Sequence, residues 1–419
     1  MDVRDTVEAV FRIESARLVA GLARIVRDVG LAEELAQDAL VIALEQWPVK
    51  GVPDDPGPWL MATAKHRAVD VLRRRATYDR KLAVLGAAAE PVVDEEPDLD
   101  DHIQDDLLRL IFTACHPALS TESQVALVLR TLGGLGTGAI ARAFLTTEAT
   151  VSQRILRAKR TLAAERVQFE LPPPAQLPVR LSAVLGVVYL IFNEGYSASA
   201  GDDWARPQLC EEAIRLGRVL AGLLPSEPEV HGLCALMELQ AARIRARTAP
   251  DGAPVLLMDQ DRRLWDRLLI RRGLAALAAA ETLGTLGPYG LQAAIAACHA
   301  RALHPGDTDW ARIAALYRLL AHVAPSAVVR LNLAVAVGMA SGPAAGLELL
   351  DELTAAGALP SYPYLPAARG DLLDRLGRRD EARAEFARAA ALTGNERERD
   401  LFRARAAAPP QDPDGGVVG

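Results

Sequence analysis

The chain has 419 residues, enough for two or three domains, and its 50% apolar and 24% charged residues are ordinary values for a globular protein. Its formal net charge of −7 argues mildly against a nucleic-acid-binding protein, although the distribution of charge matters more than the total. Ala, Leu and Arg dominate while β-branched residues are few, which favours helices over strands.

The first residues, MDVRDTVEAVF, lack the basic segment and apolar core of a secretory signal peptide. No apolar run is predicted to approach the roughly 20 residues that span a membrane. The four cysteines form no CxxC pair, which favours a reducing compartment over a disulfide framework or a zinc site. They are Cys115, Cys210, Cys234 and Cys298. We therefore expect a cytoplasmic protein without a metal or other cofactor.

Residues 30–47, GLAEELAQDALVIALEQW, have the period of an amphipathic helix. The predicted inner stripe consists of Leu31, Leu35, Ala39 and Ile42. The outer face carries Glu34, Gln37, Asp38 and Glu45. An acidic helix face usually contacts water, but it also suits docking onto a basic partner helix.

Residues 57–81, GPWLMATAKHRAVDVLRRRATYDRK, are predicted to form a basic helix, with seven basic residues against two acidic ones. Near its start stands Trp59. If this tryptophan is exposed, the helix suits a melted DNA strand, held by base stacking and phosphate contacts. The alternative is a core tryptophan followed by an arginine cluster that suits the helix dipole.

Residues 82–106 form a predicted acidic linker containing DEEPDLDDHIQDD, and residues 107–167 form a second helical block. The block ends with a short helix, GAIARAF, a polar turn, and a helix that Thr147 or Thr150 is placed to cap. The buried stripe of the last helix is predicted to be Val151, Ile155, Ala158 and Leu162. Helix, short turn and basic helix is the order of a helix-turn-helix.

Local charge supports DNA binding by this second block. Between Gly138 and Arg166 the chain carries six basic residues and two acidic ones. The arginines are expected to neutralise phosphates, and Gln153 or Arg157 to reach base edges. The alternative is an amphipathic helix whose basic side only contacts water.

The remainder of the chain is predicted to be helical as well. A Pro-rich linker at residues 168–180 includes ELPPPAQLP, residues 181–405 contain short Ala- and Leu-rich helices, and residues 406–419 are expected to be a disordered tail. VVYLIF, at residues 187–192, is the best candidate for a strand, but it continues a helical pattern and is predicted to be buried helix. The predicted fold class is therefore all-α.

A repeat pattern appears near the end of this helical part. LGRRDEARAEFARAAAL carries Gly377, Ala382, Phe386 and Ala389 at the spacing of the second helix of a tetratricopeptide (TPR) unit. A weaker copy is SGPAAGLELLDEL, with Ala345 and Leu349 in the equivalent places, and WARIAALY resembles a first helix. A generic helical hairpin is the alternative, because two or three degenerate units are few for a stacked array.

No catalytic constellation is predicted. Cys298, His299 and His304 lack a matching carboxylate, and TLGGLGTG lacks the lysine and the preceding strand of a phosphate-binding loop. The polar string FNEGYSAS, with Asn193, Glu194 and Tyr196, is predicted either to make an interdomain contact or to satisfy itself at a buried helix end. We therefore do not expect an enzyme.

The order of these segments resembles a bacterial extracytoplasmic-function (ECF) sigma factor of the sigma-70 family. AEELAQDALVIALEQWP resembles the region-two helix that binds the β′ clamp helices of RNA polymerase, and PWLMATAKHRAVDVLRRR resembles the segment that melts the minus-10 element. LTTEATVSQRILRAKRTL resembles the region-four recognition helix for the minus-35 element. LRLIFTACHPALSTESQVALVLRTLGGL resembles the start of region four, which contacts the β flap. LIFNEGYSAS and the TPR-like end resemble the subgroup with a long helical carboxyl-terminal extension.

The resemblance implies roles for individual residues. His66 stands where many members have an asparagine beside the flipped minus-10 base, which leaves the base preference open. The residues implied in core-polymerase binding are Glu34, Gln37, Asp38 and Gln46. Those implied in minus-10 binding are Trp59, Lys65, His66, Arg67, Arg73 and Arg74. Those implied in minus-35 binding are Ser152, Gln153, Arg154, Leu156, Arg157, Lys159 and Arg160.

The resemblance also implies domains and partners. We expect a region-two domain at residues 1–81, a region-four domain at residues 107–167 and a helical extension at residues 181–405. The acidic linker is expected either to thread the basic path through the polymerase or to be a plain tether. The implied partners are core RNA polymerase, promoter DNA and a protein bound by the TPR-like part. The alternative function is a helix-turn-helix regulator fused to a helical-repeat sensor or scaffold.

Overall fold

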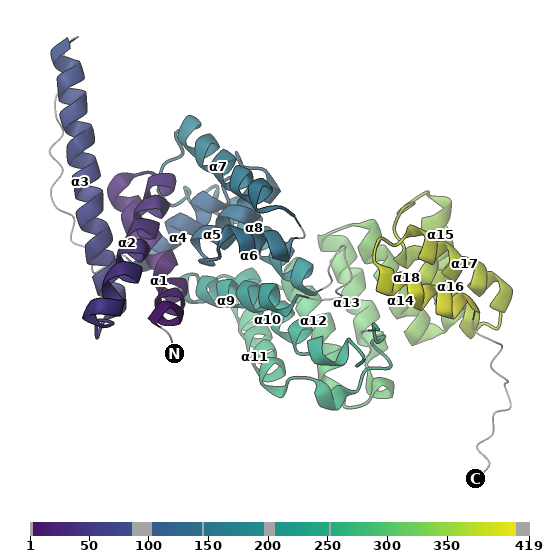
Figure 1. Ribbon diagram of the computed structural model, residues 1–419. Helices are drawn as coiled ribbons and strands as arrows, with labels where there is room; N and C mark the ends of the chain where they lie inside the picture. The colour runs from purple at the N-terminus through teal and green to yellow at the C-terminus, as the bar shows by residue number, and fades with distance from the viewer. Residues whose placement is uncertain (1–2, 86–102, 145, 197–205, 251–252, 408–419) are drawn as a thin grey trace. The chain divides into compact units, whose positions relative to one another are not determined.

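The computed structural model describes residues 3–85, 103–144, 146–196, 206–250 and 253–407 (Figure 1). Within these ranges the chain is all-α, as predicted, and the only β pairing is an isolated bridge between Thr248 and Pro254. The chain divides into two compact units, Met1–Leu190 and Ile191–Gly419. Most of the acidic linker and of the tail lies outside the described residues, so the predicted domain boundaries stay predictions.

The first unit is built from helices that pack mainly on α1 and on α7. Helices α2, α3 and α4 contact α1, while α5 and α6 contact α7. Helix α3 extends beyond α1 and α2 (Figure 1). The bounds are α1 Val3–Val26, α2 Val29–Lys50, α3 Pro56–Leu85, α4 Ile103–Ala114, α5 Thr121–Thr131, α6 Thr137–Ala143 and α7 Glu148–Ala164. Helix α8, Leu177–Tyr196, begins in the first unit and ends in the second.

Helix α2 begins at an Asp28 cap, whose carboxylate accepts a hydrogen bond from Leu31 N at 3.0 Å. Its inner side differs slightly from the predicted stripe, because Leu31 and Ile42 are only half-buried. The buried residues of α2 are Val29, Ala32, Glu33, Leu35, Ala36, Ala39, Ala43 and Trp47. Small alanines on this side allow α1 to approach α2 closely. The buried side of α2 is therefore the side that carries these alanines.

Helices α6 and α7 form the predicted helix-turn-helix. Thr147 caps α7, since its hydroxyl accepts a hydrogen bond from Thr150 N at 3.1 Å. The predicted stripe of α7 is confirmed, because its buried residues are Val151, Ile155, Ala158 and Leu162. Burial of this side against α5 and α6 leaves the opposite side of α7 to solvent.

Helix α8 contains VVYLIF, which is helical as predicted, with Val187, Val188, Ile191 and Phe192 buried. Contrary to the expectation from the sequence, α8 is long and apolar enough to cross a membrane by length and composition, and 39% of its most apolar window is buried. One such helix is weak evidence for a membrane span, because core helices of globular proteins pass the same test. Arg180 of α8 donates a hydrogen bond to Phe112 O at 2.7 Å.

The second unit is a succession of helices in which neighbours along the chain pack together. Short 3₁₀ turns at Ile244–Ala246, Arg262–Leu264 and Pro305–Asp307 interrupt it. The α-helices are α9 Pro207–Leu223, α10 Pro228–Ala241, α11 Arg267–Leu283, α12 Pro288–Arg301, α13 Trp310–Val323, α14 Ala327–Ser341, α15 Pro343–Ala355, α16 Tyr364–Arg375, α17 Arg379–Leu392 and α18 Glu396–Ala407.

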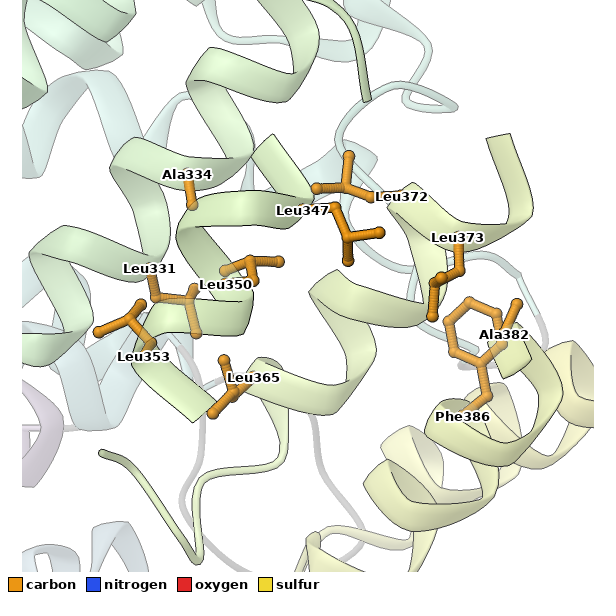
Figure 2. Close-up of a cluster of buried hydrophobic side chains, with 10 residues drawn as sticks. All are labelled: Leu331, Ala334, Leu347, Leu350, Leu353, Leu365, Leu372, Leu373, Ala382 and Phe386. Atoms are coloured by element: carbon orange, nitrogen blue, oxygen red, sulfur yellow. The ribbon is translucent and has the colours of Figure 1, made fainter. Parts of the chain in front are cut away.

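Helices α14 to α17 form two consecutive hairpins around one apolar cluster (Figure 2). Gly377, at φ 77°, makes the turn between α16 and α17, and Phe386 packs against Gly370. In the earlier hairpin, buried residues at the same spacing as Ala382, Phe386 and Ala389 are Gly346, Leu350 and Leu353. The predicted positions Ala345 and Leu349 are half-buried, one residue away. The assignment of these hairpins as TPR units stays a prediction.

Candidate nucleic-acid interface

The outer side of α7 presents polar and basic groups to solvent. Ser152, Gln153, Arg157 and Arg160 are exposed, Leu156 is 46% exposed, and Arg154 is half-buried. The apolar stripe fixes the rotation of the helix, so these side chains share one accessible side. A helix with Gln and Arg on its free side has the donors and acceptors that major-groove base edges require, and its arginines suit phosphates.

Lys159 differs from its neighbours on α7. Its ammonium donates to Glu33 Oε2 at 2.7 Å and to Gly30 O at 3.4 Å, and it lies 3.8 Å from Glu34 Oε1. Only 15% of its side chain is exposed. In this arrangement Lys159 contacts α2 and does not belong to the exposed basic side.

Glu33 is the residue that the sequence reasoning missed. Its side chain is 7% exposed, and its Oε1 accepts a second charged hydrogen bond, from Arg130 Nε at 2.8 Å. Val29, Glu33 and Ala36 stand at i, i+4 and i+7, so helical spacing placed a carboxylate at an inner position. A buried carboxylate requires charged partners. A glutamate at an inner position of α2 was therefore the feature of the sequence that could have indicated an ion pair.

The remaining predicted polymerase-binding residues occupy different positions on α2. Glu34 is 70% exposed, whereas Gln37 is half-buried. Asp38 is exposed and lies 3.4 Å from Arg67 of α3, one of the predicted minus-10 residues. Gln46 accepts a hydrogen bond from Lys50 at 3.1 Å. An exposed ion pair of this kind contributes little to stability, so Asp38 and Arg67 can exchange partners readily.

Helix α3 carries the predicted minus-10 residues. Trp59 is half-buried and makes an edge-to-face contact with the buried Trp47, with ring centroids 5.4 Å apart. Trp59 is therefore neither fully exposed nor a core residue, because part of its ring packs on Trp47 and part remains accessible to solvent. Lys65 is half-buried. The exposed residues of this set are His66, Arg67, Arg73 and Arg74.

Asp106, which was predicted to belong to the acidic linker, has a structural role instead. It lies in α4, is buried, and pairs with Arg24 of α1 at 3.3 Å and with Arg109 at 3.0 Å. Asp105 in the same helical turn is exposed. The other linker carboxylates, between residues 94 and 101, lie outside the described residues.

The FNEGYSAS string begins at the end of α8. Within the second unit, Glu194 pairs with Arg206, and the Tyr196 hydroxyl meets Gln240 and accepts from Arg243 Nη2. Asn193 is exposed. These partners come from outside the string, and both predicted roles of the three residues stay predictions.

Several titratable groups of the second unit are buried, and burial shifts the pKa of each. Burial raises the pKa of Cys210 and Cys234 to about 12, as it does for Cys115 in the first unit, so these thiols are poor nucleophiles. Burial, with the charges of Arg243 and Arg262, lowers the pKa of His299 to about 3. No group of three metal-ligating side chains occurs among the described residues.

Comparison with known proteins assigns families to three parts of the chain. Residues 12–78 match Sigma-70 region 2, residues 109–162 match Sigma-70 region 4, and residues 180–281 match a family of unknown function, DUF6596. The two sigma matches coincide with α1–α3 and α4–α7. No solved structure matches the chain.

Two kinds of relative extend this assignment. The uncharacterized protein R00370 of Rhizobium meliloti (strain 1021) is 45% identical over 391 residues, which is 92% of this chain and 91% of the relative. The probable ECF RNA polymerase sigma factor SigI of Mycobacterium tuberculosis is 27% identical over 175 residues, 41% of this chain and 60% of that protein. The chain therefore belongs to the sigma-70 family, as an ECF-type sigma factor with a helical carboxyl-terminal extension that it shares with the Rhizobium protein.

Proposed function

We propose that this protein is a promoter-specificity subunit that acts only in complex with core RNA polymerase. In this proposal α2 binds the β′ clamp helices, α3 melts the minus-10 element, and the region-four domain contacts the β flap and recognises the minus-35 element. The helical extension regulates these steps in cis and binds a protein partner. The protein is non-enzymatic and works in the cytoplasm.

The outer side of α7 is the observation that carries the proposal. Gln153 and Arg157 are exposed one helical turn apart, above a stripe that is fully buried. An exposed glutamine suits adenine, an exposed arginine suits guanine, and Leu156 between them suits a thymine methyl group. Ser152, Arg154 and Arg160 flank these positions and suit the phosphate backbone.

Melting of the minus-10 element is proposed for α3 on similar grounds. His66 and Arg67 are exposed at the middle of the helix, and Arg73 and Arg74 continue the basic side. Arginines and lysines hold a single strand by its phosphates, while an imidazole and the accessible part of Trp59 offer surfaces for base stacking. His66 is thus expected to replace the usual asparagine by stacking or by hydrogen bonding.

Run-off transcription tests the proposal directly. Purified core polymerase would be incubated with the upstream region of the gene, with and without the full-length protein. We expect a start site that appears only with the protein. Because α7 supplies the base contacts, Gln153→Ala with Arg157→Ala should lower that transcript at least tenfold, with each lost contact removing about 1–3 kcal/mol of discrimination.

A matched control uses Arg263→Ala in the extension, where the lost charge comes from an exposed residue paired with its own neighbour Asp261. That variant should transcribe as the wild type does. Absence of any transcript from a promoter library, together with no binding to core polymerase, would contradict the proposal. Tight binding of the free protein to a duplex operator would instead support the helix-turn-helix regulator.

A further inference from the structure

One carboxylate of α2 holds two cations from the region-four domain. Glu33 accepts from Arg130 Nε at 2.8 Å and from Lys159 Nζ at 2.7 Å, residues that follow it by 97 and 126 positions. Both oxygens of Glu33 are satisfied, and its side chain is nearly inaccessible. Charge-assisted hydrogen bonds of this kind are stronger in a protected site than on an open surface.

The first turn of α2 is shaped to receive the lysine. The lysine Cδ would lie 3.3 Å from a Cβ placed on Gly30, so the aliphatic stem crosses the helix where no side chain intervenes. The ammonium then reaches Gly30 O as well as Glu33. The absence of a side chain at Gly30 therefore permits this close approach.

A second contact supports the same arrangement. Gly134 follows α5, and a Cβ there would lie 2.6 Å from Ser15 Oγ and 3.3 Å from Arg12 Cα of α1. The turn after α5 is thus in close contact with α1, and Arg130 Nη1 donates to Leu135 O of the same turn at 3.4 Å. The pairing of Glu33 is therefore accompanied by a second contact between the region-four and region-two domains.

This arrangement competes with both proposed partners. Lys159 is one of the predicted minus-35-binding residues, and its ammonium is occupied by Glu33. On the α2 side, Gln37 borders a cavity of about 460 Å³ together with Arg130, and the exposed Glu34 lies 3.8 Å from Lys159. Region four therefore occupies part of the α2 surface that is proposed to bind the polymerase.

We propose that Glu33 is a latch that keeps Lys159 from DNA in the free protein, and that docking of core polymerase on α2 releases it. The inference rests on the proposed function and adds the residues that couple its two binding events. Because both partners favour the open arrangement, polymerase binding strengthens promoter binding, and promoter binding strengthens polymerase binding. An unpaired buried Glu33 is unfavourable, so the latch closes again when the polymerase leaves.

Lysine acetylation offers a test at the level of single residues. The chain has four lysines, Lys50, Lys65, Lys81 and Lys159, so mass spectrometry of peptides can follow each one after a pulse of a water-soluble acetylating reagent. In the free full-length protein Lys159 should react several-fold more slowly than the exposed Lys50. Lys159 also borders an open cavity of about 400 Å³, which gives the reagent a route to it.

The variant Glu33→Gln removes the charge and should raise the acetylation rate of Lys159 several-fold, with Lys50 unchanged. The matched control is Glu14→Gln, because Glu14 pairs with Arg17 on its own helix and not with region four. Equal rates at Lys159 and Lys50 in the wild type would overturn the latch. An unchanged Lys159 rate in a Glu33→Gln protein that melts cooperatively would also overturn it.

The wild-type protein bound to core polymerase needs no substitution and tests the release step. Lys159 should become several-fold more reactive when core binds, and slow again when promoter DNA is added. Core binding that leaves Lys159 slow would overturn the release. Failure of core polymerase to bind would contradict both the proposed function and the release step. The acetylation rate of Lys159 in the free protein would still show whether Glu33 pairs with Lys159.

Discussion

At the scale of single residues, Gly346 shows how closely the helices of the extension approach. A Cβ at this position would lie 2.6 Å from Ala334 O and 2.7 Å from Gly338 Cα, both backbone atoms of α14. Gly346→Ala must push α15 away from α14, which costs about 1–3 kcal/mol, offset by about 1 kcal/mol of helix propensity. We expect a net loss of up to about 2 kcal/mol, measured as a lower urea midpoint.

The control for this substitution is Gly222→Ala near the end of α9. Nothing lies within 4 Å of a Cβ there, so only the gain in helix propensity remains. Gly222→Ala should leave the urea midpoint unchanged or slightly higher. Equal effects of the two substitutions would show that the contact between α14 and α15 is not tight.

The same scale shows what sequence could and could not predict of the candidate site. Helical period alone placed Gln153 and Arg157 on the free side of α7, because the apolar stripe fixes its rotation. The predicted inner stripe of α2 did not include Glu33, which is buried and whose partners come from helices far along the chain. Only tertiary structure brings Arg130 and Lys159 to it, so Lys159 was predicted to bind the minus-35 element and not to pair with Glu33.

At the scale of elements, the start of α7 depends on one hydroxyl. Thr147 accepts from Thr150 N and thereby satisfies one of the free N–H groups of the first turn. Thr147→Ala should cost about 1 kcal/mol, a usual value for a lost amino-terminal cap, and should lower the melting temperature of the protein. Since α7 is the proposed recognition helix, minus-35-dependent transcription should fall as well.

Two substitutions separate the cap from other effects at this turn. Thr147→Ser retains the accepting oxygen and should behave as the wild type. Thr150→Ala removes the 2.8 Å contact between the two hydroxyls but keeps the backbone cap, so it should cost less than Thr147→Ala. If Thr150→Ala lowers the melting temperature more than Thr147→Ala does, the backbone cap by Thr147 is not the main stabilising contact at this turn.

Element registers were harder to predict than the elements themselves. The alanine-rich α2 and α15 each have several sides of similar hydrophobicity. The side with the smallest side chains packs against the neighbouring helix, because it allows the closest approach. In α15 the selected residue is Gly346, because only a glycine allows the approach to Gly338, and this places the buried side one position from the predicted Ala345. Local pattern therefore gave helices correctly and their buried sides to within one residue.

At the scale of the whole molecule, the acidic net charge does not describe the charge of each helix. A net charge of −7 coexists with basic sides on α3 and α7, and two of their cations, Arg67 and Lys159, are paired with carboxylates of α2. Composition and helical period were sufficient to predict the all-α class, and the family resemblance of the segments implied both sigma regions. The pairing between the regions depends on distant contacts, which no local pattern contains.

The extension gives the last prediction. A protein ending at Tyr196 keeps α8 and its hydrogen bond from Arg180 to Phe112, but it loses the helices from α9 onward. If the extension takes the role of a separate inhibitor, this truncation should raise run-off transcription several-fold while core binding is retained. Full-length Gly346→Ala, which loosens only one hairpin, should produce a smaller rise. Unchanged transcription and core binding in a folded truncated protein would show that the extension does not regulate in cis.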